Sequence, residues 1–176
     1  GCMALKNALV AAGAKVTVAT SALEADILIH GTSEELGLDL LGHAGKDRNE
    51  VFPPFEVDLR LVDGTVLTLG DLSIRAIEVP GHNPGCMCYL INVSDGKKFL
   101  FAGDVISVGG VISLGNWVGS NLQAYRSGLK KLSGLSIDGL LPGHFMFTIC
   151  NGQSHIDKAN MAFGGLFPPP NVSQLP

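Results

Sequence analysis

Short runs of alternating apolar and polar residues fill the middle of the chain and predict a β-sheet. The runs occupy residues 57–78, 86–93, 99–102 and 137–141. Their period of two is that of a strand with one buried face. Asp-Gly at 63–64 and Gly-Asp at 70–71 interrupt the first run, and such pairs are typical of hairpin turns. The pattern therefore predicts a meander of antiparallel strands, with a further turn at 94–97.

Apolar residues spaced by three and four predict helices on both sides of these strands. The expected helices cover 2–12, about 21–30, a short stretch within 32–54, 121–133 and 151–163. Thr20 or Ser21 is a suitable N-cap for the second helix, with Glu24 in the capping-box position for Ser21. A short β-branched strand at 15–19 is expected between the first two helices. Together the elements predict a mixed α/β (α+β) protein.

Chain length and composition predict one domain with a substantial core. The 176 residues are 46% hydrophobic and only 16% charged, and 23 of them are glycine, which suits a buried sheet with many tight corners. We expect a single domain over residues 1–166. The tail at 167–176 contains too many prolines for helix or sheet and should be extended or poorly ordered.

Charge and cysteine usage exclude several classes of function. The net charge is −4, and no Lys/Arg cluster exceeds a pair, so nucleic acid is not an expected partner. No apolar run reaches the roughly 18 to 20 residues of a membrane span, so a membrane is not expected either. The four cysteines do not form a disulfide framework, which favours a reducing compartment and a cytoplasmic location.

The candidate chemistry lies at three positions where a predicted strand stops. His82, Asp104 and His144 each stand at such a corner, next to glycine or proline. A side chain at a strand end is both firmly aimed and open to solvent. Imidazole and carboxylate are donors that zinc, iron and manganese accept, so the three residues are candidate metal ligands. The alternative for any one of them is an ordinary turn residue.

The residues around these corners resemble the motifs of a known family. They are Pro-Gly-His-Asn-Pro-Gly at 80–85, Phe-Ala-Gly-Asp at 101–104 and Leu-Pro-Gly-His at 141–144. In this order and at this spacing the chain resembles the metallo-β-lactamase-fold hydrolases, in particular their glyoxalase II-like branch. The resemblance implies the C-terminal portion of an αββα sandwich, without its first strands.

One motif of the family is absent. The opening His-x-His-x-Asp-His, which supplies four further metal ligands in family members, is not found in the chain. In the family a helix follows that motif, and residues 2–12 look like this helix. The resemblance therefore implies that the first strands and the first metal motif lie upstream of Gly1.

The resemblance also implies a reaction. It assigns His82 to one metal ion, His144 to a second ion and Asp104 to a bridging position, with two zinc ions in the complete site; iron and manganese are the other metals to consider. The two ions share a hydroxide that attacks the substrate. The implied function is hydrolysis of an ester, thioester, amide or lactone bond in a small-molecule substrate, the thioester being favoured by the glyoxalase II-like motifs.

Two further hypotheses remain open beside the hydrolase. Because Asp104 would bridge, this chain offers each ion only two side chains, whereas catalytic zinc usually has three protein ligands. The chain is therefore alternatively a metal-free, inactive fragment or a binding or scaffold module of the same fold. A weaker option is a redox or oxygen-handling relative that uses iron. Self-association into a homo-oligomer is expected if a sheet face lacks its covering strands.

Several other residues carry weaker hypotheses. Asn116 and Trp117 stand in a Gly-rich loop beyond Asp104 and are candidate substrate contacts, with packing of the indole as the alternative. Cys86, Cys88 and Cys150 are expected to be small buried side chains rather than zinc ligands. His155, on the last predicted helix, is expected to be a surface or hydrogen-bonded histidine.

Overall fold

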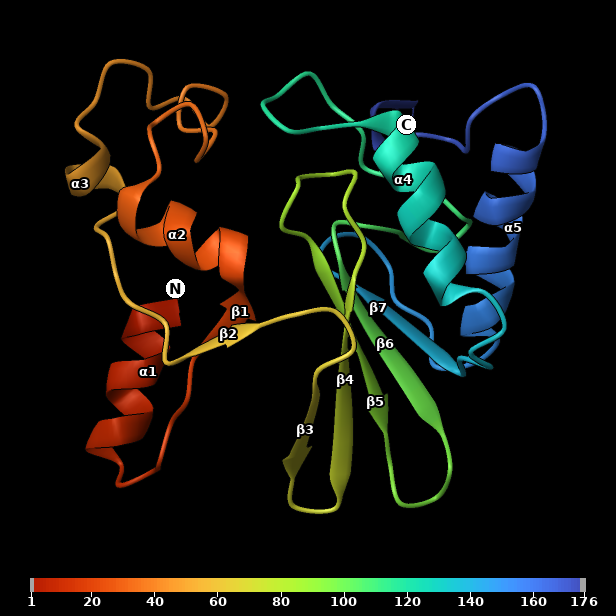
Figure 1. Cartoon of the computed structure of the whole chain (residues 1–176), viewed down its shortest axis with the longest axis horizontal. Helices are drawn as coiled ribbons and strands as arrows, with labels where there is room; N and C mark the ends of the chain where they lie inside the picture. Colours follow the sequence, from red (N-terminus) through yellow and green to blue (C-terminus); the bar gives the residue numbers. More distant parts are fainter. Residues whose placement is uncertain (1, 175–176) are drawn as a thin grey trace. The chain divides into compact units, whose positions relative to one another are not determined.

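A five-stranded sheet carries the candidate residues, and two helices cover one of its faces (Figure 1). The computed structural model describes residues 2–174. These residues form two units, which divide between Leu61 and Val62. The expected single domain over 1–166 stays a prediction.

The first unit contains three helices and a small parallel sheet. Its elements are α1 (Cys2–Ala11), β1 (Ala19–Ser21), α2 (Ala22–His30), α3 (Arg48–Val51) and β2 (Leu59–Leu61). The Ser21 hydroxyl accepts a hydrogen bond from the Glu24 amide at 3.1 Å, so Ser21 is the N-cap of α2 as the sequence indicates. The strand expected at 15–19 begins only at Ala19, where pairing with Leu59 starts.

The second unit contains the sheet in the order β3-β4-β5-β6-β7. Its strands are β3 (Val66–Leu69), β4 (Leu72–Glu78), β5 (Met87–Asn92), β6 (Lys98–Gly103) and β7 (Gly139–Pro142). The first four strands pair antiparallel, as the hairpin signals predict, while β7 lies parallel to β6. A parallel neighbour requires a crossover connection, which helix α4 (Leu122–Leu129) supplies.

The hairpin expected at Asp63-Gly64 is wrong. Strand β2 pairs with β1 instead of with β3, so the first run of alternating residues is split between two sheets. Asp63 lies beside the end of β4, where its carboxylate accepts a hydrogen bond from the Glu78 amide at 2.9 Å. Alternation identifies a strand with one buried face, but it does not identify the strand's partner.

The core of the second unit lies between the sheet and its helices. Side chains that alternate toward one face of β4 to β7 pack against α4, the short 3-10 helix η1 (Lys130–Leu132) and α5 (Gly152–Gly164). The fully buried members include Leu100, Leu140, Tyr125, Leu129 and Ile156. Within residues 2–174, no helix has the length and apolar character that crossing a membrane requires.

Residues 170–172 of the Pro-rich tail are hydrogen-bonded to the loop after Asp104, and residues 175–176 lie outside the described residues. Ile112 donates its amide to the Pro170 carbonyl at 2.9 Å, and Val172 donates to the Ile112 carbonyl at 3.0 Å. The Asn171 side chain makes two bonds to the Leu114 backbone, and a 3-10 turn η2 (Val172–Gln174) follows. A proline-rich segment can still form hydrogen bonds to a neighbouring loop through its carbonyls and an Asn side chain. Amino-acid composition alone does not predict such bonds.

Candidate metal centre

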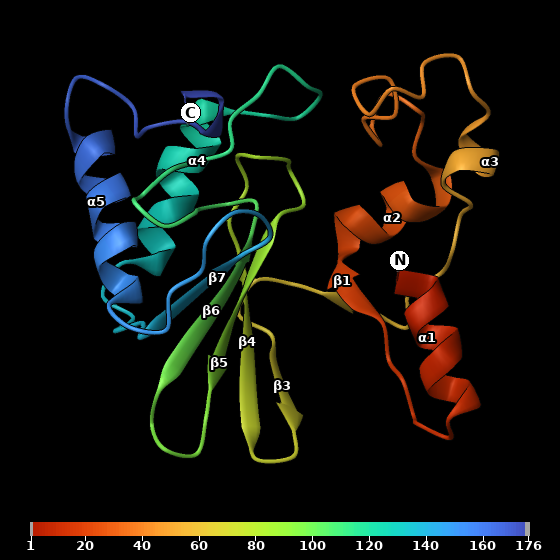
Figure 2. The same cartoon turned by 180° about the vertical axis from the view of Figure 1, so that it is seen from behind.

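Three strand ends meet at one edge of the sheet (Figure 2). His82 follows β4, Asp104 follows β6 and His144 follows β7. Strands β4 and β6 are both antiparallel to β5, and β7 is parallel to β6, so the three strands end at the same edge. The structure therefore brings the three predicted residues together.

The two imidazoles face different oxygens of one carboxylate. His82 Nε2 lies 3.7 Å from Asp104 Oδ2, and His144 Nε2 lies 3.6 Å from Asp104 Oδ1. Both separations are too long for hydrogen bonds. Ligands bonded to one zinc ion at about 2.0–2.2 Å lie roughly 3.2–3.7 Å from each other. The donor set therefore fits a carboxylate that bridges two ions, with one imidazole on each.

This arrangement differs from a closed site for one ion. Among residues 2–174 there is no group of three or more His, Cys, Asp or Glu side chains that could hold a single metal ion. Each imidazole lies near a different oxygen of Asp104. His144 is the most accessible member, with 73% of its side chain exposed against 21% for His82.

The tautomer of His82 is determined by a hydrogen bond to the backbone. Its Nδ1 lies 2.8 Å from the Ser113 carbonyl oxygen. A carbonyl only accepts, so Nδ1 carries a proton, and in the neutral ring the Nε2 lone pair lies on the side of Asp104. Metal-binding histidines in proteins are commonly held by a second partner in this way. The Ser113 carbonyl gave no signal in the sequence, because any residue type can supply it.

Trp117 holds the same histidine from the other side. Its indole Nε1 donates to the His82 carbonyl at 2.7 Å, and the two rings meet edge to face with centroids 4.9 Å apart. The indole of Trp117 therefore packs against His82, which is the alternative role that the sequence analysis gave it. Contact of Trp117 and of the exposed Asn116 with substrate stays a prediction.

The corner at His144 depends on close approach of the backbone to Asp104. The Gly143 amide donates to the Gly103 carbonyl at 2.7 Å, which ties the His144 corner to the Asp104 corner. A Cβ added at Gly143 would lie 2.9 Å from Asp104 Oδ1. Glycine is therefore needed here for space, since a side chain would displace the carboxylate.

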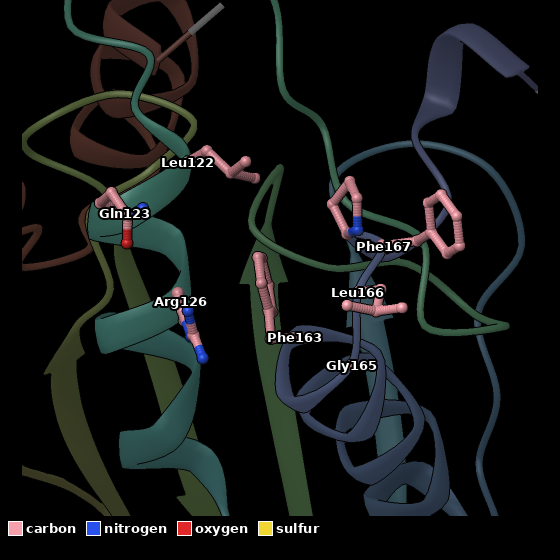
Figure 3. Close-up of a pocket in the computed structure, with 8 residues that line it drawn as sticks. Leu122, Gln123, Arg126, Phe163, Gly165, Leu166 and Phe167 are labelled. Carbon is pink, nitrogen blue, oxygen red and sulfur yellow. The ribbon is translucent and has the colours of Figure 1, made fainter.

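A cavity of about 140 Å³ lies between α4 and the end of α5 (Figure 3). Figure 3 shows Arg126 and Leu122 on one wall, opposite Phe163, Leu166 and Phe167. None of the three candidate ligands lines it.

The expectation that the cysteines are buried is confirmed for Cys88, which lies in the core, but it is wrong for Cys150, which is exposed.

His155 is hydrogen-bonded, as expected for a histidine without a ligand role. Its Nδ1 accepts a hydrogen bond from the Gly109 amide at 3.1 Å, which attaches the loop after Asp104 to α5. Burial, assisted by the Lys158 ammonium, lowers the pKa of this imidazole. The neutral form is the one that can accept this hydrogen bond.

The pKa shift predicts how stability depends on pH. The unfolded chain binds the His155 proton more tightly than the folded chain, so its contribution to the free energy of unfolding is complete above about pH 6.5 and is lost as the pH falls through the folded-state pKa. His155→Asn keeps an acceptor oxygen that does not titrate. Urea unfolding between pH 7.5 and pH 5 should show a smaller loss of stability for His155→Asn than for the natural chain. Equal losses in the two proteins would show that this histidine does not contribute.

Comparison with known proteins gives a consistent result. The sequence model of the metallo-beta-lactamase superfamily matches residues 4–144. An acyl-coenzyme A thioesterase, MBLAC2 from Gallus gallus, is 35% identical over 104 residues, which are 56% of this chain and 35% of that protein. A hydroxyacylglutathione hydrolase from Rhodopseudomonas palustris is 43% identical over 63 residues, which are 36% of this chain and 23% of that protein. The matched regions thus span about a third or less of these relatives.

Solved structures agree with the sequence matches. A metallo-beta-lactamase from Cronobacter sakazakii superposes with a TM-score of 0.54 at 26% identity, covering 73% of this chain and 48% of that one. A metallo-beta-lactamase family protein from Thermus thermophilus superposes with a TM-score of 0.60 at 18% identity, covering 85% of this chain and 53% of that one. The predicted fold class is confirmed, over part of the fold of these proteins. With the family model matching most of its length, this chain belongs to the metallo-beta-lactamase superfamily.

Proposed function

We propose that this chain contributes His82, Asp104 and His144 to the metal site of a hydrolase. The observation that supports the proposal best is the placement of the two imidazole Nε2 atoms, 3.7 Å and 3.6 Å from separate oxygens of Asp104. The sequence matches to the superfamily support a hydrolase in general. That the hydrolysis depends on metal, and which bond it breaks, are part of what we propose.

Each of the three side chains has a distinct role in the proposed site. Asp104 would hold both ions through its carboxylate, and its negative charge would offset their mutual repulsion. His82 presents the Nε2 lone pair that its bond to Ser113 leaves free. His144, the exposed member, lies on the side from which a substrate can approach. When bound, such ions polarise the group under attack and lower the pKa of water, which supplies a nucleophile at neutral pH.

The proposal requires further donors. Three side chains with one bridging give two protein ligands to each ion, whereas catalytic zinc usually has three. The site as proposed is complete only when at least one more donor reaches each ion. Zinc binding by this chain alone should therefore be measurable but weak.

A thioester is the proposed substrate class. Several of the similar proteins are thioesterases by name. They include the acyl-coenzyme A thioesterase of Gallus gallus and an atrochrysone carboxyl ACP thioesterase of Aspergillus fumigatus, the latter 29% identical over 84 residues. Esters, amides and lactones remain the other bonds to test, since the same chemistry attacks each of these carbonyls.

A direct assay tests the proposal. The purified chain is incubated with an acyl-coenzyme A, its oxygen ester and its amide over a series of zinc concentrations, and release of free thiol or acid is followed. Because the chain supplies only two side chains to each ion, we expect slow thioester hydrolysis that rises with zinc and disappears when a chelator removes the metal. Absence of hydrolysis of every bond at saturating zinc would contradict an activity of this chain, and equal rates with and without chelator would contradict its metal dependence.

A further inference from the structure

The hydroxyl of Tyr125 lies where two backbone segments of the candidate metal centre meet. Tyr125 is on α4 and is completely buried. Its hydroxyl is 3.0 Å from the Asp104 carbonyl and 3.2 Å from the Ser113 carbonyl, and it accepts a hydrogen bond from the Ser113 amide at 3.3 Å. One phenol has a single proton to donate, so it serves either carbonyl while it accepts from the amide.

Through these contacts Tyr125 reaches two of the three candidate ligands. It bonds directly to the backbone of Asp104. It reaches His82 through Ser113, whose carbonyl accepts the Nδ1 proton at 2.8 Å. The two ligands belong to different corners of the sheet, and Ser113 lies on the loop beyond Asp104. The tyrosine hydroxyl therefore connects the corner that carries Asp104 with the residue that orients His82.

The ring itself is held in place. At Gly81, next to His82, an added Cβ would lie 2.3 Å from Tyr125 Cγ, so the ring packs directly on this backbone. The amide of Asn121, the N-cap of α4, donates to the Gly81 carbonyl at 2.8 Å. The packing of the ring therefore fixes the position of the hydroxyl. The hydrogen bonds of the hydroxyl in turn restrain the backbone of Asp104 and Ser113.

We propose that Tyr125 is a positioning residue of the metal centre: its hydroxyl fixes Ser113 relative to Asp104 and so keeps His82 protonated on Nδ1, with Nε2 directed at the carboxylate. A role of Tyr125 in catalysis rests on the proposed function. The orientation of His82 by Ser113 and Tyr125 is present without metal. Removal of a residue that orients a metal ligand through hydrogen bonds typically lowers metal affinity by about 10- to 100-fold.

Tyr125→Phe tests the proposal because it removes the hydroxyl and keeps the ring. In the metal-free protein, nitrogen NMR of the histidine rings should show His82 as a single Nδ1-protonated tautomer in the natural chain and as a mixture in the variant. Zinc titration against a competing chelator should show an affinity about 10- to 100-fold lower for the variant. Ile137→Val is the control, since it trims a buried side chain without touching this network.

The outcomes separate this proposal from the proposed function. An unchanged His82 tautomer in Tyr125→Phe would overturn the positioning role, as would an equal change in Ile137→Val. If the natural chain shows the single tautomer but hydrolyses nothing, the hydrolase proposal fails and the positioning of His82 stands. Should Tyr125→Phe not fold, fluorotyrosine incorporation retains the hydroxyl and changes its acidity. The His82 ring resonance should then shift, and no shift would overturn the proposal.

Discussion

Asp104→Asn is expected to lose zinc binding and zinc-dependent hydrolysis almost completely. The substitution keeps the shape of the side chain but leaves one oxygen where two now face His82 and His144. The amide nitrogen that replaces the other oxygen carries protons and cannot bind a metal ion. Loss of a bridging ligand removes a donor from both ions, so zinc affinity should fall by more than the roughly 100-fold that loss of an outer partner causes.

The measurement is a zinc titration of both proteins, with hydrolysis followed in parallel. Asp71→Asn is a matched control, because Asp71 is an exposed carboxylate in the turn between β3 and β4 and lies at neither of the corners. It should bind zinc like the natural chain. If Asp104→Asn keeps its zinc affinity within about threefold of the natural chain, Asp104 is not a metal ligand. The bridging arrangement on which the proposal depends would then be wrong.

The sequence was sufficient to locate the candidate ligands, because strand ends are local features. Alternation and hairpin signals predict β4, β5 and β6 as consecutive antiparallel strands, and an even number of reversals returns the chain to the same edge. The positions of His82 and Asp104 at one edge of the sheet therefore follow from the order of strands and turns alone. His144 also stands at a predicted strand end, but its place at the same edge followed only from the resemblance to a family, since its strand β7 arrives by a helical crossover.

The support of these ligands could not be predicted in the same way. Tyr125 stands at a core position of its helix, and a buried tyrosine needs a partner for its hydroxyl, so some hydrogen bond was foreseeable. Its actual partners are backbone atoms of Asp104 and Ser113, and backbone atoms have no pattern in a sequence. The pairing of β2 with β1 and the docking of Asn171 on Leu114 escaped prediction for the same reason.

Gly81→Ala is expected to destabilise the second unit strongly. A Cβ at this position would lie 2.3 Å from Tyr125 Cγ, 2.5 Å from Cδ2 and 2.8 Å from its Cα. The last of these is a backbone atom of α4, so a rotation of the tyrosine ring cannot relieve the clash. Overpacking typically costs about 1–3 kcal/mol and more when the neighbours cannot move. The φ of +150° at Gly81 adds strain for any L-residue.

Gly96→Ala separates the two causes of this destabilisation. Gly96 also has a positive φ, +85°, but a Cβ there would meet no atom within 4 Å. Urea unfolding of both variants therefore compares a positive-φ glycine with close neighbours to one without them, and we expect Gly81→Ala to lose about 2 kcal/mol more stability than Gly96→Ala. Because Gly81 adjoins His82, the same variant should also lose zinc affinity, whereas Gly96→Ala should keep it. Equal destabilisation of the two variants would mean that α4 can move away from the His82 corner, and the rigid support that we infer from Tyr125 would then be absent.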